Sequence, residues 1–62
     1  MKLNKKAIDI IRAEKQIEVT ELIKKSDISS STLHAAYKRD VDPLVIGRIA
    51  KALQVNITDI IQ

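Results

Sequence analysis

The sequence predicts an all-α fold, and three observations support this. Apolar residues recur at intervals of three and four along most of the chain. One glycine and one proline leave little room for the tight turns of a small β-barrel. Tyr37 is the only aromatic residue of the Phe, Trp and Tyr type, so aliphatic side chains have to fill the core. We expect one domain over residues 1–62, a compact bundle of five short helices.

The first helix is expected to begin after Asn4, whose side chain can cap it, and to end at about Lys15. Leu3 and Ile8 have the spacing of a hydrophobic staple across its start. Ile8 and Ile11 recur on one face, which we expect to pack on the core.

A second helix is expected over residues 19–25, with Leu22 buried. Lys24 and Lys25 lie at its end. They either complement the negative end of the helix dipole or contact phosphate groups, and the sequence leaves both interpretations open. The Ser-Asp pair that follows interrupts the helical periodicity and predicts a tight turn.

The third helix is expected to begin after Ser29, because its hydroxyl can accept from the free amides of the first turn. It runs to about Lys38, with Leu33 and Ala36 on its inner side. The second and third helices therefore form a helix-turn-helix over residues 19–38. The residues left on the outer side of the third helix are Ser30, Ser31, His34, Ala35 and Lys38.

Asp42 and Pro43 predict the start of a fourth helix, since a proline in the first turn loses no hydrogen bond. Gly47 within it is interpreted as a point of close helix approach, at a propensity cost of about 1 kcal/mol. Asn56 then caps a last short helix, Ile57 to Ile61. The apolar stripe of the fourth helix comprises Ile46, Ile49, Ala50 and Leu53.

The composition disfavours several classes of site. Without cysteine there can be no disulfide or thiolate metal site, and one histidine is too few for most His-based metal sites. Gly47 stands alone, so there is no Gly-rich phosphate loop. We expect no cofactor and no metal. No signal peptide or long apolar run is visible, which predicts a cytoplasmic, nucleoid-associated protein without a membrane partner.

An enzyme is the least favoured class of function. His34 lies among serines, but Ser30, Ser31 and His34 share one helix with no evident oxyanion hole or enclosing cleft. Asp40 and Asp42 are too few for a metal cage. We therefore expect no catalytic residues.

The polar start of the third helix suits duplex DNA instead. A helix fits the major groove, where hydroxyls, an imidazole and a lysine can reach base edges, and the first amides can hold a phosphate. The net charge of +3 favours a polyanionic partner on so small a surface. The simpler alternative is that the serines cap the helix and face solvent, and that the charge only keeps the domain soluble.

Two segments of the chain carry a family resemblance. The first comprises Leu22, Ile28, Ser29, Thr32, Leu33 and Ala36. The second is residues 49–61, IAKALQVNITDII, which has an apolar helix end, a turn and a capped apolar helix. From Ile17 to Ile61 the chain resembles the phage-repressor-like helix-turn-helix family of Cro and CI type, also called the XRE family. The resemblance implies a five-helix bundle of the lambda-repressor-like DNA-binding type.

Four residues depart from the family pattern. Ile23 stands where a small alanine is usual, and Ser26 where an apolar residue is common. Asp27 replaces the usual glycine of the turn, which tolerates a left-handed conformation. Val19 replaces a glutamine that often contacts a phosphate. These substitutions bear on the helix crossing and on one phosphate contact, and they leave the fold intact.

The resemblance also implies roles for single residues. The implied base-reading residues are Ser30, Ser31 and Ala35, with His34 and Lys38 beside them. The implied phosphate-binding residues are Ser29, Thr32, Lys38 and Arg39. Serine and alanine cannot form the bidentate base contacts of Arg or Gln, so we expect modest direct readout supplemented by DNA shape and water.

We therefore expect a small sequence-specific transcriptional regulator of the Cro/repressor type, encoded by a phage or mobile element. It would bind palindromic or paired half-sites in double-stranded DNA as a homodimer, in solution or only on DNA, with recognition helices about 34 Å apart. Ile57, Ile60 and Ile61 are the candidate dimer surface; alternatively, they close the monomer core. The other open function is a protein-interaction module, antirepressor-like or antitoxin-like, that binds a partner regulator.

Overall fold

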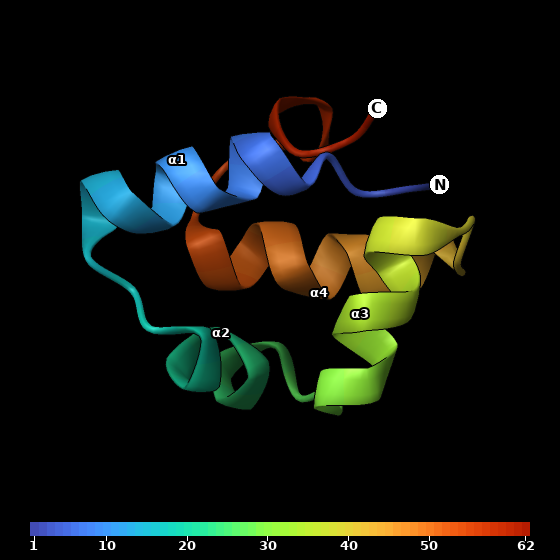
Figure 1. The fold of residues 1–62 in the computed structure, drawn as a ribbon, viewed down its shortest axis with the longest axis horizontal. Helices are drawn as coiled ribbons and strands as arrows, with labels where there is room; N and C mark the ends of the chain where they lie inside the picture. Colours follow the sequence, from blue (N-terminus) through green and yellow to red (C-terminus); the bar gives the residue numbers. More distant parts are fainter.

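The computed structural model describes all 62 residues and consists of four α-helices and one 3-10 turn (Figure 1). The elements in chain order are α1 (Lys5–Lys15), α2 (Val19–Ser26), α3 (Ser30–Lys38), α4 (Pro43–Leu53) and the 3-10 turn η1 (Ile57–Asp59). The all-α prediction is confirmed, and the four predicted helix ranges agree with the observed ones to within a residue. No helix has both the length and the apolar character needed to cross a membrane.

The fifth helix, expected over Ile57 to Ile61, is instead the single 3-10 turn η1, which ends at Asp59. The Ile60 amide bonds the Ile57 carbonyl at 3.0 Å, three residues back. The next backbone groups bond elsewhere: the Ile60 carbonyl accepts from Asn4 at 2.8 Å, and Ile61 forms an antiparallel bridge with Leu3. These extended contacts compete with a further helical turn and end it.

The core is formed by ten buried residues drawn from all four helices and both chain ends. Helix α4 lies in the middle of the molecule, between α1 and the α2–α3 pair (Figure 1). Full burial of one Leu or Ile side chain is worth about 1.5–3 kcal/mol, so this cluster supplies most of the driving force for folding. Its members are Leu3, Ile8, Leu22, Leu33, Ala36, Ile46, Ile49, Ala50, Leu53 and Ile60.

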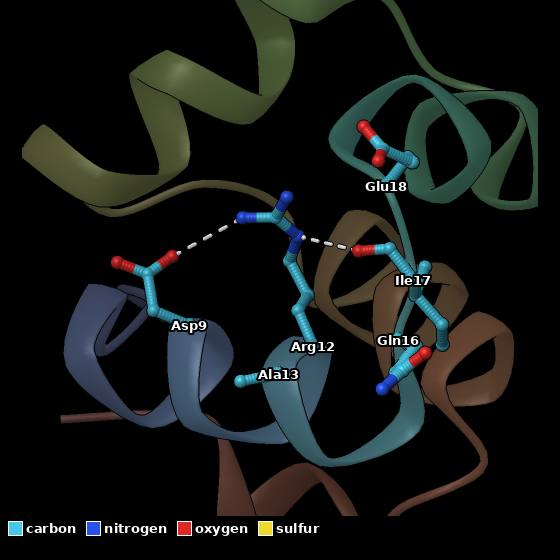
Figure 2. A pocket seen from close by; sticks show the side chains of 6 residues that line it. All are labelled: Asp9, Arg12, Ala13, Gln16, Ile17 and Glu18. Atoms are coloured by element: carbon cyan, nitrogen blue, oxygen red, sulfur yellow. Dashed lines mark hydrogen bonds and ion pairs between the residues drawn. The ribbon is translucent and has the colours of Figure 1, made fainter.

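Arg12 fixes the connection between α1 and α2. Its Nε donates to the Ile17 carbonyl at 3.1 Å, and its Nη1 lies 3.4 Å from Asp9 (Figure 2). Asp9 also accepts from Lys5 at 2.9 Å, and this hydrogen bond holds the pKa of Asp9 below its usual value. Asp9 therefore positions Arg12, and Arg12 in turn holds the backbone that connects α1 to α2.

Three helices end in residues with left-handed backbone conformations, and none of these is glycine. They are Gln16, Asp27 and Gln54, with φ of 55°, 57° and 58°. Each of these residues uses its amide to close the last helical turn. At Asp27 this is the conformation expected of the turn in the helix-turn-helix. A left-handed residue other than glycine costs roughly 1–2 kcal/mol, which the surrounding packing has to offset.

Ser26 is buried, at a position where the Cro/CI-type family that the chain resembles usually has an apolar residue. Its hydroxyl donates to the Leu22 carbonyl at 2.6 Å, one turn back on α2. A buried hydroxyl that is satisfied in this way carries no unpaired polar group into the core. Ile23, the other bulky departure in α2, is only partly buried.

The interpretation of Gly47 as a point of close helix approach is wrong. A Cβ built on Gly47 would meet no atom within 4 Å, outside its own helix backbone and chain neighbours. The residue lies within α4 at an ordinary helical position. Packing therefore gives no reason for glycine here.

We expect Gly47→Ala to stabilise the fold by about 0.5–1 kcal/mol, because alanine loses less backbone entropy in a helix. Urea unfolding followed by circular dichroism measures the change. An unchanged or lowered free energy of unfolding would show that the space beside Gly47 is not free.

The start of α3 generates a second prediction. The Ser29 Oγ accepts from the Thr32 amide at 3.1 Å, as predicted for an N-cap. We expect Ser29→Ala to destabilise the protein by about 1 kcal/mol in the same unfolding measurement. Ser30→Ala is the matched control, since Ser30 is exposed and its side chain makes no hydrogen bond within the chain. Equal losses in the two variants would contradict the capping role.

Candidate nucleic-acid interface

The outer face of α3 brings together the side chains that the sequence assigned to base reading. Leu33 and Ala36 are buried and hold the helix to the core. The opposite side of the helix is open to solvent along its full length. Ser30, Ser31, His34 and Lys38 are exposed and Ala35 is half-buried. Their grouping on one face is a structural fact, and their contact with bases remains a prediction.

Hydroxyl groups cluster at the amino end of α3. The Ser29 Oγ lies 3.0 Å from the Ser31 Oγ and 2.8 Å from the Thr32 Oγ1. Three hydroxyls carry three protons, and these two contacts use two of them, so one O–H remains free to donate outward. The Ser30 and Ser31 amides, in the same first turn, also have no backbone partner, whereas the Thr32 amide is capped by the Ser29 Oγ. The arrangement is suited to an anion such as a phosphate oxygen.

Tyr37 orients His34, a contact that the sequence reading missed. The two rings meet edge to face, with centroids 6.4 Å apart and planes at 63°. Tyr37 is half-buried, and this burial raises the pKa of its phenol. The Lys5 ammonium lies 5.7 Å from the centroid of the same ring. The spacing of His34 and Tyr37, three residues apart in a helix, was the available signal.

The loop after α3 is fixed by the amino-terminal segment. The Met1 carbonyl accepts from the Val41 amide at 2.8 Å, and the Met1 amino group donates to the Val41 carbonyl at 3.2 Å. The same amino group lies 3.6 Å from Asp40. Lys38 and Arg39 precede this anchored segment and are exposed, and neither forms an ion pair. Their charges are therefore available to a polyanion.

The two lysines at the end of α2 differ in their contacts. Lys25 pairs with Glu21, one turn back, at 3.0 Å. Lys24 is exposed and forms no ion pair. Arg48 of α4 lies 3.5 Å from the Asp27 carbonyl, which links α4 to the turn between α2 and α3. Lys25 is thus engaged in an intrahelical pair, while the charge of Lys24 stays open to phosphate.

The alternatives of a Ser–His site and a metal site concern His34 and the acidic residues. His34 makes no hydrogen bond to a serine; the hydroxyls of Ser29 and Ser31 bond to each other, and that of Ser29 also to Thr32. No group of three or more His, Cys, Asp or Glu side chains is placed to hold a metal ion.

The three residues of the candidate dimer surface are not equivalent. Ile60 is fully buried in the core, so in this fold it closes the monomer and cannot contact a second copy. Ile57 and Ile61 are partly buried and pack against the same core. The second interpretation of this segment, closure of the monomer, therefore holds for Ile60.

Comparison with known proteins gives one match. The family model described as the Cro/C1-type HTH DNA-binding domain matches residues 7–62, which include α2, α3, α4 and η1 in full. Neither the curated proteins nor the solved structures gave a match. The matched region takes in the helix-turn-helix and most of the core that supports it. The chain therefore belongs to the family of Cro/C1-type helix-turn-helix DNA-binding domains.

Proposed function

We propose that the chain is a transcriptional regulator that binds specific duplex DNA sequences, with α3 in the major groove. Family membership gives DNA binding in general. The observation that carries the finer proposal is the outer face of α3, where five side chains suited to a groove lie exposed or half-exposed on one helix. None of them forms an ion pair within the chain.

Base reading is proposed to rest mainly on His34 and Lys38. Both side chains are long enough to reach acceptors on base edges, such as O6 and N7 of guanine. Ser30, Ser31 and Ala35 are short, so the backbone of α3 can approach the bases closely. With few bidentate contacts available, sequence-dependent DNA shape supplies part of the specificity.

Phosphate contacts are proposed on either side of these residues. At the start of α3, the free hydroxyl proton of the Ser29–Thr32 cluster and the first amides face one strand. At its end, Lys38 and Arg39 face the other. Because the following loop is held by Met1, both cations sit at a defined distance from the start of the helix. Contacts at both ends would set the register of α3 in the groove.

A binding-site selection at two salt concentrations tests the proposal. We expect enrichment of a defined sequence and a steep loss of affinity as salt rises, because bound cations release counterions from DNA. Equal binding to all sequences, or no binding, would contradict specific recognition and favour a module that binds another regulator protein.

The phosphate contacts make a separate prediction. Lys38→Ala or Arg39→Ala should weaken binding to every DNA sequence and reduce the slope of log affinity against log salt by about 1. Because Lys38 is also proposed to reach base edges, Lys38→Ala should in addition change the preferred base at one position. Lys51→Ala is the matched control, since it removes one exposed lysine from the far end of α4. Fluorescence anisotropy on a fixed duplex measures all three variants. If Lys51→Ala lowered the DNA affinity as much as the other two variants, only the net charge of the protein would matter.

The base contacts predict a change of preference instead. Ser31→Ala or His34→Ala should alter which base is favoured at one or two positions of the selected site, by about 1 kcal/mol for each lost contact. The salt slope should stay the same. The measurement is a repeat of the selection with each variant, and an identical consensus would show that the reading face lies elsewhere.

A further inference from the structure

The outward face of α1 carries an apolar groove that the proposed function does not use. Ile10 is 51% exposed, although it lies in the middle of the helix. The groove runs between α1 and the segment that follows α4. It is lined by Ala7, Ile10, Ile11, Glu14, Val55 and Asp59.

The residues around Ile10 form a self-complementary pattern. Alanines stand three residues away on each side, at Ala7 and Ala13. Charges of opposite sign stand four residues away, Lys6 on one side and Glu14 on the other. On a helix, residues three and four apart share a face, so all five belong to one surface. We call these five residues the α1 face.

The two charges of the α1 face have no partner within the chain. The ion pairs on α1 are Lys5–Asp9 and Asp9–Arg12, which leave Lys6 and Glu14 exposed and unpaired. Single exposed apolar residues are ordinary on protein surfaces, and Leu44 is more exposed than Ile10. The distinguishing feature of the α1 face is the pair of unpaired opposite charges placed symmetrically about Ile10. It is the arrangement that a two-fold interface requires, since each residue must then meet its complement on an identical surface.

We propose that the α1 face binds the α1 face of a second copy, with the two helices antiparallel. A two-fold axis beside Ile10 brings the two Ile10 side chains together. Lys6 lies about 6 Å along the helix from Ile10, and Glu14 lies the same distance in the other direction. The antiparallel arrangement therefore sets Lys6 of each copy against Glu14 of the other. The small alanines let the backbones approach.

A parallel pair is disfavoured by the same charges. It would set Lys6 against Lys6 and Glu14 against Glu14, with repulsion at both ends. The acidic rim formed by Glu14 and Asp59 would also suit a basic apolar helix of another protein. The second copy is favoured because it satisfies Lys6 as well, and because the pattern is symmetric about Ile10.

This pairing leaves the DNA-binding surface free. In Figure 1, α1 and the C-terminal segment together form the side of the molecule opposite to α2 and to the start of α3. None of the five residues of the α1 face belongs to α3 or to the loop that follows it. The pair is therefore expected to form without DNA.

The association should be weak, because one short helix face from each copy buries less surface than a standard interface. We expect a dissociation constant on the order of 10–100 µM. Sedimentation equilibrium of the full chain without DNA, over micromolar to millimolar concentrations, measures it. Leaving DNA out makes the result independent of whether the proposed DNA specificity is correct.

Charge reversal provides the decisive variants. Lys6→Glu alone, or Glu14→Lys alone, places like charges at both ends of the pair and should weaken association at least tenfold. The double variant Lys6→Glu/Glu14→Lys should restore it. An equimolar mixture of the two single variants should also associate, because each then presents the charge that the other lacks. Ile10→Ser should weaken association both in the wild-type chain and in the double variant Lys6→Glu/Glu14→Lys.

The fold should survive these changes. Lys6→Glu adds an acidic residue near the start of α1 and Glu14→Lys a basic one near its end, and the helix dipole favours both. Circular dichroism of each variant checks this. A wild-type chain that stays monomeric at about 1 mM overturns the proposal. Association that survives both single reversals, or a mixture that does not associate, overturns it as well.

Discussion

The packing of other elements on the buried stripe of α4 is the constraint on which the remaining structure depends. Ile46, Ile49, Ala50 and Leu53 are all in the core, and α2 makes its main contact with this helix. The chain has no disulfide and no metal to replace that contact. Because α2 and α3 are too short to be stable alone, the angle at which they are presented is set by how α2 sits on α4. The geometry of the proposed DNA-binding surface is therefore a product of core packing.

Polar contacts then determine how each helix begins and ends. Asn4, Ser29 and Asp42 each accept a backbone amide with their side chain, so three of the four helices start at a defined residue. Lys15, the last residue of α1, donates from its Nζ to the carbonyl of Leu53, the last residue of α4, at 2.7 Å. This bond joins the ends of α1 and α4. Apolar burial supplies the free energy, while these bonds select one arrangement of helices over its neighbours.

Much of the fold was accessible from sequence because its signals are local. Cap residues and apolar spacing located α1 to α4, and the serine-rich start of α3 pointed to the exposed face. What was missed depends on contacts distant in sequence. The length of η1 is limited by pairing with Leu3, and the loop after Arg39 is held by Met1. The interpretation of Gly47 was wrong because the sequence alone could not show that the space beside this residue is empty.

The bridge between Leu3 and Ile61 has a consequence for how the molecule opens. Asn4 donates to the Ile60 carbonyl and Gln62 to the Lys2 carbonyl, so the first and last segments hold each other. Chain ends usually fray independently at little free-energy cost. Here neither end can detach without exposing the backbone of the other and uncovering Leu3 and Ile60 in the core. Hydrogen exchange of the amides at the two ends should therefore report a common free energy of opening, as one cooperative unit.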